Sequence, residues 1–254
     1  MRIDINCDMG ESFGACRIGD DEAIMPFISS ANIACGWHAG DPMVMAETVR
    51  LAEEHAVAIG AHPGYPDLLG CGRRNIETFP GEIKNYIVYQ VGALSAFARE
   101  RGMKLQHVKP HGALYNLAAK DERAANEVIS AIKALNPELI LVAPADSLCA
   151  EMAASAGLRV VREAFPDRAY LSNGQLAPRT LQGAVIHDLD AVQLRALALV
   201  TSGRIVCVDG GEIKLEAQTL CIHGDTPDAW KLARGIRETL DRAGVQVFSM
   251  GDLI

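Results

Sequence analysis

Short apolar runs alternate with longer helical patterns along the 254-residue chain, and this alternation limits the possible folds more than any other feature. The runs are rich in Ile, Val and Leu, and most end at Gly or Pro, which is typical of buried strands. They predict strands at residues 2–7, 31–36, 57–61, 105–109, 139–143, 158–162 and 204–208. Helical spacing predicts a helix that begins at 41–42 with Asp41 as its N-cap, helices at 82–101, 123–135 and 226–243, and an additional strand pair within 215–223.

Strands that alternate with helices of this length are expected to be parallel and joined by crossovers. Seven or eight such units in about 250 residues suit a barrel better than an open sheet. We therefore predict an α/β fold with one domain, a TIM-barrel-like (β/α) barrel over residues 1–254 with seven or eight parallel strands. An open doubly wound sheet is the alternative.

Charge and cysteine content exclude several classes of function. The chain has 24 Lys and Arg against 32 Asp and Glu, so its net charge is −8 and nothing predicts binding to nucleic acid or to an anionic membrane. No apolar run approaches the roughly 18 residues of a spanning helix, and the first residues lack the apolar core of a secretory signal. The seven cysteines include no CxxC pair, and we expect free thiols in a cytoplasmic protein.

Ionisable residues are concentrated just past the ends of the predicted strands. In a barrel these ends open onto one face, where active sites are built. The residues in this position are His38, His62, His111, His223, Asp8, Lys109, Glu163, Asp209 and Asp225. We expect at least two of these histidines to line one pocket.

The first predicted strand carries three polar residues with a period of two. Asp4, Asn6 and Asp8 point to the same side of a strand, which in a barrel is the interior. Buried carboxylates are costly unless they are paired or bound to a cation. Asp8 is therefore expected at the rim as a metal ligand or general base, whereas Asp4 is as compatible with an internal hydrogen-bond network.

The segment that follows the fourth strand combines three useful residues. A lysine that faces a pocket, as we expect of Lys109, holds a phosphate or carboxylate as a point charge. His111 can transfer a proton near neutral pH, and Gly112 lets the backbone approach a ligand closely.

Two loops are candidates for binding an anion. Arg73 and Arg74 follow a glycine-rich stretch that can close over an anionic substrate, but a solvated arginine pair fits equally well. Residues 222–227 lead into the helix predicted from 226, whose N-terminus either holds an anion or has an ordinary cap.

Six motifs occur in an order that resembles one known family. They are 4–14 (DINCDMGESFG), 30–42 (SANIACGWHAGDP), 60–67 (GAHPGYPD), 108–116 (VKPHGALYN), 165–170 (FPDRAY) and 221–225 (CIHGD). Together they resemble the LamB/YcsF family from the first strand to the last helix. Cys16 and Cys71 stand where an aromatic residue and a Phe are expected, and these departures affect only local packing.

The resemblance implies a barrel related to those of glycoside hydrolases and deacetylases. It also implies ATP-dependent opening of the lactam 5-oxoproline to glutamate, with ADP and phosphate as products, Mg accompanying the ATP, and two partner subunits, B and C, of a 5-oxoprolinase. The expected catalytic residues are Asp8, His38, His62, Lys109 and His111, with Asp8 or His62 as the base. The residues expected to bind substrate or phosphate are Asn6, Glu11, Asn32, Arg73, Arg74, Tyr115, Glu163 and His223.

Several alternatives stay open at this point. The chain has no GxxxxGK[ST] and no GxGxxG motif, so ATP binds either here or on the partners. Residues 6–10 also resemble the first-strand motif of YdjC-like sugar deacetylases, so the runner-up is a metal-dependent deacetylase or amidohydrolase in which Asp8, His62 and His111 hold the metal. The second alternative is a non-catalytic subunit that binds a small acid. The oligomeric state, including a homo-oligomer, is also open.

Overall fold

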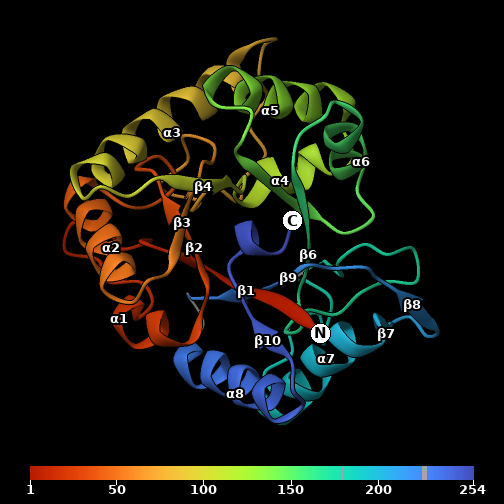
Figure 1. Ribbon diagram of the computed structural model, residues 1–254. Helices are drawn as coiled ribbons and strands as arrows, with labels where there is room; N and C mark the ends of the chain where they lie inside the picture. Colours follow the sequence, from red (N-terminus) through yellow and green to blue (C-terminus); the bar gives the residue numbers. More distant parts are fainter. Residues whose placement is uncertain (179, 225–227) are drawn as a thin grey trace.

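Seven parallel strands close into a barrel in the part of the chain that the structure describes, residues 1–178, 180–224 and 228–254 (Figure 1). In this computed structural model they are β1 (Arg2–Met9), β2 (Ser30–Ala34), β3 (Ala58–His62), β4 (Leu105–Val108), β5 (Ile140–Pro144), β6 (Val160–Ala164) and β9 (Thr219–His223). Because β9 pairs in parallel with both β6 and β1, the barrel is closed. The predicted TIM-barrel-like fold is confirmed, and the open sheet is wrong.

Helices lie around the strands, most of them in an outer ring (Figure 1). They are α1 (Asp21–Ile24), α2 (Pro42–Glu54), α3 (Glu82–Glu100), α4 (Gly112–Ala118), α5 (Glu122–Leu135), α6 (Leu148–Ser155), α7 (Leu189–Thr201) and α8 (Ala229–Arg242), with short 3-10 turns η1 (Met25–Phe27) and η2 (Met250–Asp252). Asp41 caps α2 as predicted, because its carboxylate accepts hydrogen bonds from the backbone N–H groups of Met43 and Val44 at 2.8 and 3.0 Å. No helix in these described ranges is long and apolar enough to cross a membrane.

The predicted strand at 204–208 does not belong to the barrel. Its residues form β7 (Arg204–Val206), which pairs antiparallel with β8 (Glu212–Lys214) in a hairpin at the outside of the molecule (Figure 1). A strand of a closed parallel barrel is buried on both sides. Val206 is 67% exposed, whereas the first four residues of β9 are all buried. The strand predicted at 204–208 exists as β7, but its expected place in the barrel was wrong, and the predicted strand pair within 215–223 is a single barrel strand, β9.

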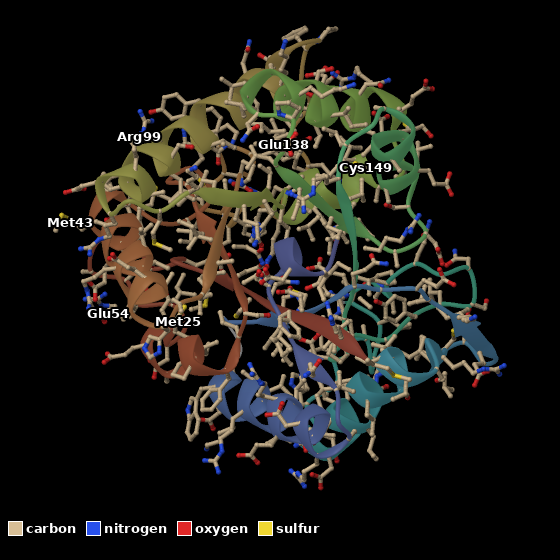
Figure 2. All side chains as sticks on the ribbon, viewed as in Figure 1. Met25, Met43, Glu54, Arg99, Glu138 and Cys149 are labelled. Carbon is tan, nitrogen blue, oxygen red and sulfur yellow. The ribbon has the colours of Figure 1, made fainter. Side chains whose placement is uncertain are left out.

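The barrel is closed at the end where its strands begin. The strand β10 (Gln246–Val247) pairs with the start of β1, and η2 follows it. The side chain of Met250 is fully buried with Ile140 and Val142 of β5 and Val161 of β6. Figure 2 shows side chains in the space between the strands, and the inward-facing Asp4, Asn6 and Thr219 are fully buried, so the barrel is a packed core. The ends of the strands at the opposite side are thus left for a functional site.

Candidate active site at the carboxyl ends of the strands

Side chains from five barrel strands and the segments that follow them, including α4, meet at this end of the barrel. The sequence-predicted residues that the structure places in contact there are Asn6, Asp8, Glu11, Asn32, His38, His62, Lys109, His111, Tyr115 and Glu163. The parallel arrangement brings them together from widely separated positions, as predicted from their location at strand ends.

Asp4 lies one layer below this site and is part of an internal hydrogen-bond network. Its carboxylate accepts hydrogen bonds from Ser30 Oγ at 2.6 Å, from Ser29 Oγ at 2.7 Å and from Thr219 Oγ1. Burial raises the pKa of Asp4 to about 6, although these hydroxyl groups oppose the change. Of the two interpretations of Asp4, the structure favours the internal network.

Replacing Asp4 with Asn is expected to change how stability depends on pH. Because the pKa of Asp4 is raised to about 6, the folded chain holds this proton more tightly than the unfolded chain, and the free energy of unfolding falls as pH rises from about 4 to about 6. Asn does not titrate in this range. The free energy of unfolding of Asp4→Asn therefore rises relative to that of the wild type, by at most roughly 3 kcal/mol.

Urea unfolding of both proteins between about pH 4.5 and pH 7 measures this difference. Burial lowers the pKa of His107 to about 3, which makes the folded chain less stable in acid. That opposite contribution is present in both proteins and cancels in the comparison. A difference in stability that stays constant with pH contradicts the prediction.

Lys109 is the centre of the buried charge network. Its Nζ atom lies 2.9 Å from Asp8 Oδ1, 2.9 Å from Glu163 Oε1 and 3.2 Å from Asn6 Oδ1. Burial disfavours the charged amine, but the adjacent carboxylate of Asp8 holds the pKa of Lys109 well above its usual value. Burial also opposes ionisation of Asp8, yet His62 and Lys109 keep its pKa well below the usual value. One ammonium group therefore faces two carboxylates.

Amide and phenol groups fix the geometry of these charges. Asn32 Nδ2 donates to Asn6 Oδ1 at 2.7 Å and to Asp8 Oδ1 at 2.9 Å. Asn6 Nδ2 donates to Glu163 Oε1 at 2.9 Å, and the Tyr115 hydroxyl donates to Glu163 Oε2 at 2.6 Å. Because each carboxylate has polar partners besides Lys109, the network is held in one arrangement.

One ring nitrogen of His62 faces one ring nitrogen of His111. His62 Nδ1 donates to the backbone oxygen of Lys109 at 2.7 Å, and His111 Nε2 donates to that of Cys71 at 2.9 Å. A carbonyl oxygen only accepts, so these two nitrogens carry hydrogen. When both rings are neutral, the lone pairs of His62 Nε2 and His111 Nδ1 face each other across 2.8 Å. A proton or a cation is needed between them.

His38 and Glu11 complete this cluster. The His38 ring stacks on His111, with ring centroids 3.8 Å apart and planes within 3° of parallel. Glu11 Oε1 lies 3.7 Å from both His38 Nε2 and His111 Nδ1. Burial lowers the pKa of His38 and of His111 well below the usual value, so both rings are neutral at physiological pH. Neither nitrogen of His38 has a hydrogen-bond partner among the described residues.

The cluster differs from the metal site expected from sequence. Four residues each offer a ligand atom within 4.8 Å of the others, and they are Glu11, His38, His62 and His111. Asp8, which was expected as a ligand, is paired with Lys109 and approaches the cluster only through Oδ2, 3.3 Å from His62 Nε2. Sequence reasoning placed Glu11 and His38 at the site but not in the metal set.

The remaining residues that were expected to bind substrate or phosphate are His223, Arg74 and Arg73, and each has a different environment. His223 Nδ1 is 2.7 Å from Asp167 Oδ2, and its ring stacks on Phe165. Arg74 pairs with Asp67, with 2.8 Å between Nε and Oδ1, and so fastens its own loop. Arg73, the preceding residue, lies close enough to the cluster for its positive charge to help lower the pKa of His38.

Two further predictions concern acidic residues and the last helix. Asp209 was expected at the strand ends, but it accepts hydrogen bonds from the backbone and side chain of Ser172 on the exposed surface, so this prediction was wrong. Asp225 and the last two residues of the turn predicted at 222–227 lie outside the described residues.

Three functional candidates were missed by sequence reasoning. Cys221 Sγ is 3.1 Å from Lys109 Nζ, and Asp167 holds His223. His107 donates through Nε2 to Asn32 Oδ1 at 2.8 Å inside the barrel. The period of two that places Lys109 inside also places His107 inside, so this residue was detectable from the sequence.

Gly112 is needed for contact between two loops. It has φ +55°, and a Cβ atom there would lie 2.6 Å from the backbone oxygen of Gly72. The backbone that comes close is thus that of the loop carrying Arg73, and Ala113 N donates to the same oxygen at 2.9 Å. This loop supplies the Cys71 carbonyl that orients His111.

Gly112→Ala is therefore expected to destabilise the chain by about 1–3 kcal/mol, because neither the left-handed backbone nor the close carbonyl suits a Cβ. The matched control is Gly92→Ala within α3, where a Cβ meets nothing within 4 Å. That control is expected to stabilise by about 0.5–1 kcal/mol. Thermal unfolding of both variants measures the effect, and equal shifts in the two would contradict it.

Comparison with known proteins identifies relatives of the chain and agrees with the fold. The LamB/YcsF family model matches residues 3–254. The chain is 66% identical to a Syntrophobacter fumaroxidans protein named as the A subunit of 5-oxoprolinase, over 99% of each chain, and 50% identical to the Pyrococcus furiosus protein of that name, over all of both chains. The crystal structure of a lactam utilization protein from Thermus thermophilus is 50% identical, covers 98% of this chain and 100% of its own, and superposes with a TM-score of 0.94.

Proposed function

Because the chain belongs to the LamB/YcsF family, we propose that it is the subunit of an ATP-dependent 5-oxoprolinase in which the lactam of 5-oxoproline is opened to glutamate. ATP and 5-oxoproline are the proposed substrates, with Mg bound to the ATP, and subunits B and C are the proposed partners. The names of the relatives support a role in a multi-subunit 5-oxoprolinase.

The observation that carries the proposal is the charge network around Lys109. A buried ammonium group beside two carboxylates, three histidines and amide donors is costly to fold and is typical of a reactive site. The site combines a cation for an anionic group with bases for water. Those are the two requirements for opening a lactam through a phosphorylated intermediate.

The chemistry balances with two water molecules. An amide resists water, and phosphorylation of the lactam oxygen by ATP makes the ring carbon electrophilic and releases ADP. One water then adds to that carbon with loss of a proton to a base, and the carbon–nitrogen bond breaks as the ring nitrogen accepts a proton. The resulting acyl phosphate is hydrolysed by the second water to glutamate and phosphate.

The residues of this chain divide these tasks. Lys109 neutralises the charge that develops on the phosphorylated oxygen, and Asp8 stays ionised beside it. The histidine cluster activates water and returns the proton to the leaving nitrogen, because His62 and His111 present lone pairs there. Tyr115 and Asn6 hold Glu163 in position on the other side of Lys109.

One observation favours the runner-up, a metal-dependent deacetylase or amidohydrolase. The cluster of Glu11, His38, His62 and His111 has the composition of a metal site. That function requires neither ATP nor partner subunits, so a single assay separates it from the proposed one. A subunit that only binds a small acid would show saturable binding of 5-oxoproline without turnover.

The test measures the release of glutamate and ADP from 5-oxoproline plus ATP. We would assay this chain alone, subunits B and C without it, and all three together. Stoichiometric glutamate and ADP from the complete set alone supports the proposal. Absence of glutamate from the complete, folded set overturns it, and metal analysis with acetylated sugars as substrates would then examine the runner-up.

A further inference from the structure

The lone pairs of the histidine cluster converge on one point. The carbonyl groups of Lys109 and Cys71 fix the hydrogens of His62 and His111 on the far side of each ring. Their free nitrogens are only 2.8 Å apart, which neutral rings do not tolerate without something between them. Glu11 Oε1 is 3.7 Å from His111 Nδ1, and His38 lies beside it with no hydrogen-bond partner among the described residues.

From this geometry we infer that Glu11, His62 and His111 bind a divalent transition-metal ion, with His38 as the fourth ligand. The inference deepens the proposed function, and only the role of the ion in turnover rests on that function. Binding of the ion by the chain is a separate property that the cluster itself predicts.

Three distances within the cluster are close to those of a tetrahedral ion, and all four ligand atoms lie within 4.8 Å of one another. With metal–nitrogen bonds of about 2.0–2.1 Å, adjacent ligand atoms of a tetrahedron are about 3.3 Å apart. The measured separations are 2.8 Å between His62 Nε2 and His111 Nδ1, and 3.7 Å from Glu11 Oε1 to both His111 Nδ1 and His38 Nε2. Movements of these ligand atoms by about 0.5 Å relative to one another would bring the three separations to the roughly 3.3 Å of a tetrahedral ion.

His38 must turn to become the fourth ligand. Its ring is parallel to that of His111, and an ion in the plane of one ring lies out of the plane of the other. A turn of the His38 ring breaks no hydrogen bond to a described residue. Gly64 and Gly72 lie against it, and a Cβ on either would come within 2.8 Å of His38 atoms, so glycine at both positions is needed to accommodate this side chain.

The donor set selects the class of ion. Imidazole nitrogen suits Zn²⁺, Co²⁺ or Fe²⁺, whereas Mg²⁺ requires oxygen ligands. The proposed ion is therefore distinct from the Mg²⁺ that accompanies ATP. Four protein ligands fill a tetrahedral shell, so water reaches the ion only when it expands to five-coordinate. The ion then lowers the pKa of that water and takes over its activation from the histidine lone pairs. The competing interpretation is one proton shared between His62 and His111 with no metal.

The test uses Co²⁺ alone as the probe, added to chain that has been stripped with a chelator. We expect one Co²⁺ per chain, with visible absorption of a nitrogen- and oxygen-ligated ion and no thiolate charge-transfer band. His62→Asn, His111→Asn and Glu11→Gln are each expected to weaken binding by about 100-fold or more. His38→Asn should alter the visible spectrum. His55→Asn, an exposed histidine at the end of α2, is the matched control and should bind as the wild type does.

Circular dichroism checks that each variant is folded, and Glu11→Gln removes a ligand with almost no change in shape. The site is overturned if the wild type binds no Co²⁺ at micromolar concentrations, if binding survives the three ligand substitutions, or if a thiolate band appears. Metal binding without 5-oxoproline turnover in the complete set overturns the proposed function and leaves the site. Full turnover by metal-free chain with its partners overturns the role of the ion and leaves the function.

Discussion

Lys109→Met is expected to abolish turnover and to lower the free energy of unfolding by about 3–5 kcal/mol. The substitution keeps the length of the side chain but removes the ammonium group that lies 2.9 Å from both Asp8 and Glu163. Two carboxylates are then left in the interior without their cation. For a chain of this size the loss corresponds to roughly 10 °C in melting temperature, which differential scanning calorimetry measures directly.

A variant with three substitutions separates the two effects of Lys109. In Lys109→Met combined with Asp8→Asn and Glu163→Gln, no unpaired charge is left, so most of the lost stability should return. Turnover should not return, because the cation for the phosphorylated oxygen is still missing. If Lys109→Met retains turnover near the wild-type rate, or if the triple variant is no more stable than the single one, the assigned role of Lys109 is wrong.

Asp8→Asn is expected to reduce turnover by about 10²–10⁴-fold while stability changes little. After this substitution the positive charge of Lys109 is still balanced by the carboxylate of Glu163, which lies 2.9 Å from it. The new amide can accept from Asn32 and Lys109 as Asp8 does now, but its nitrogen faces His62 Nε2 and occupies that lone pair. Steady-state glutamate release with all three subunits measures the effect, and urea unfolding measures stability.

Glu163→Gln is the matched control, since it removes the same charge from the other side of Lys109. Glu163 contacts Asn6 and Tyr115, whereas Asp8 is the carboxylate against His62. Turnover should therefore fall further in Asp8→Asn than in Glu163→Gln. The reverse order would show that the reacting groups lie on the Glu163 side. Asp4→Asn, one layer deeper, should leave turnover close to that of the wild type.

The apolar pattern of the sequence predicted most of the barrel strands. Residues 204–208 show the limit of that prediction. Residues 204–208 have the same apolar composition as a barrel strand, yet Val206 is exposed and β7 forms a hairpin outside. Composition cannot distinguish a strand buried on both sides from one buried on one side, because burial depends on what packs against it. The closing strand was decided by the pairing of β9 with β1 and β6.

The sequence by itself determined which chemical groups gather at the site. Period-two spacing places Asp4, Asn6 and Asp8 on the inner side of β1, and strand ends place Lys109 and the histidines at one face. Only the tertiary structure decided the protonation pattern and the charge balance. Backbone carbonyls from two separate segments set which nitrogens of His62 and His111 are free, and the two carboxylates that share Lys109 come from β1 and β6. Hydrogen bonds and charge pairing act between atoms within a few ångströms, and those distances exist only once the barrel has closed.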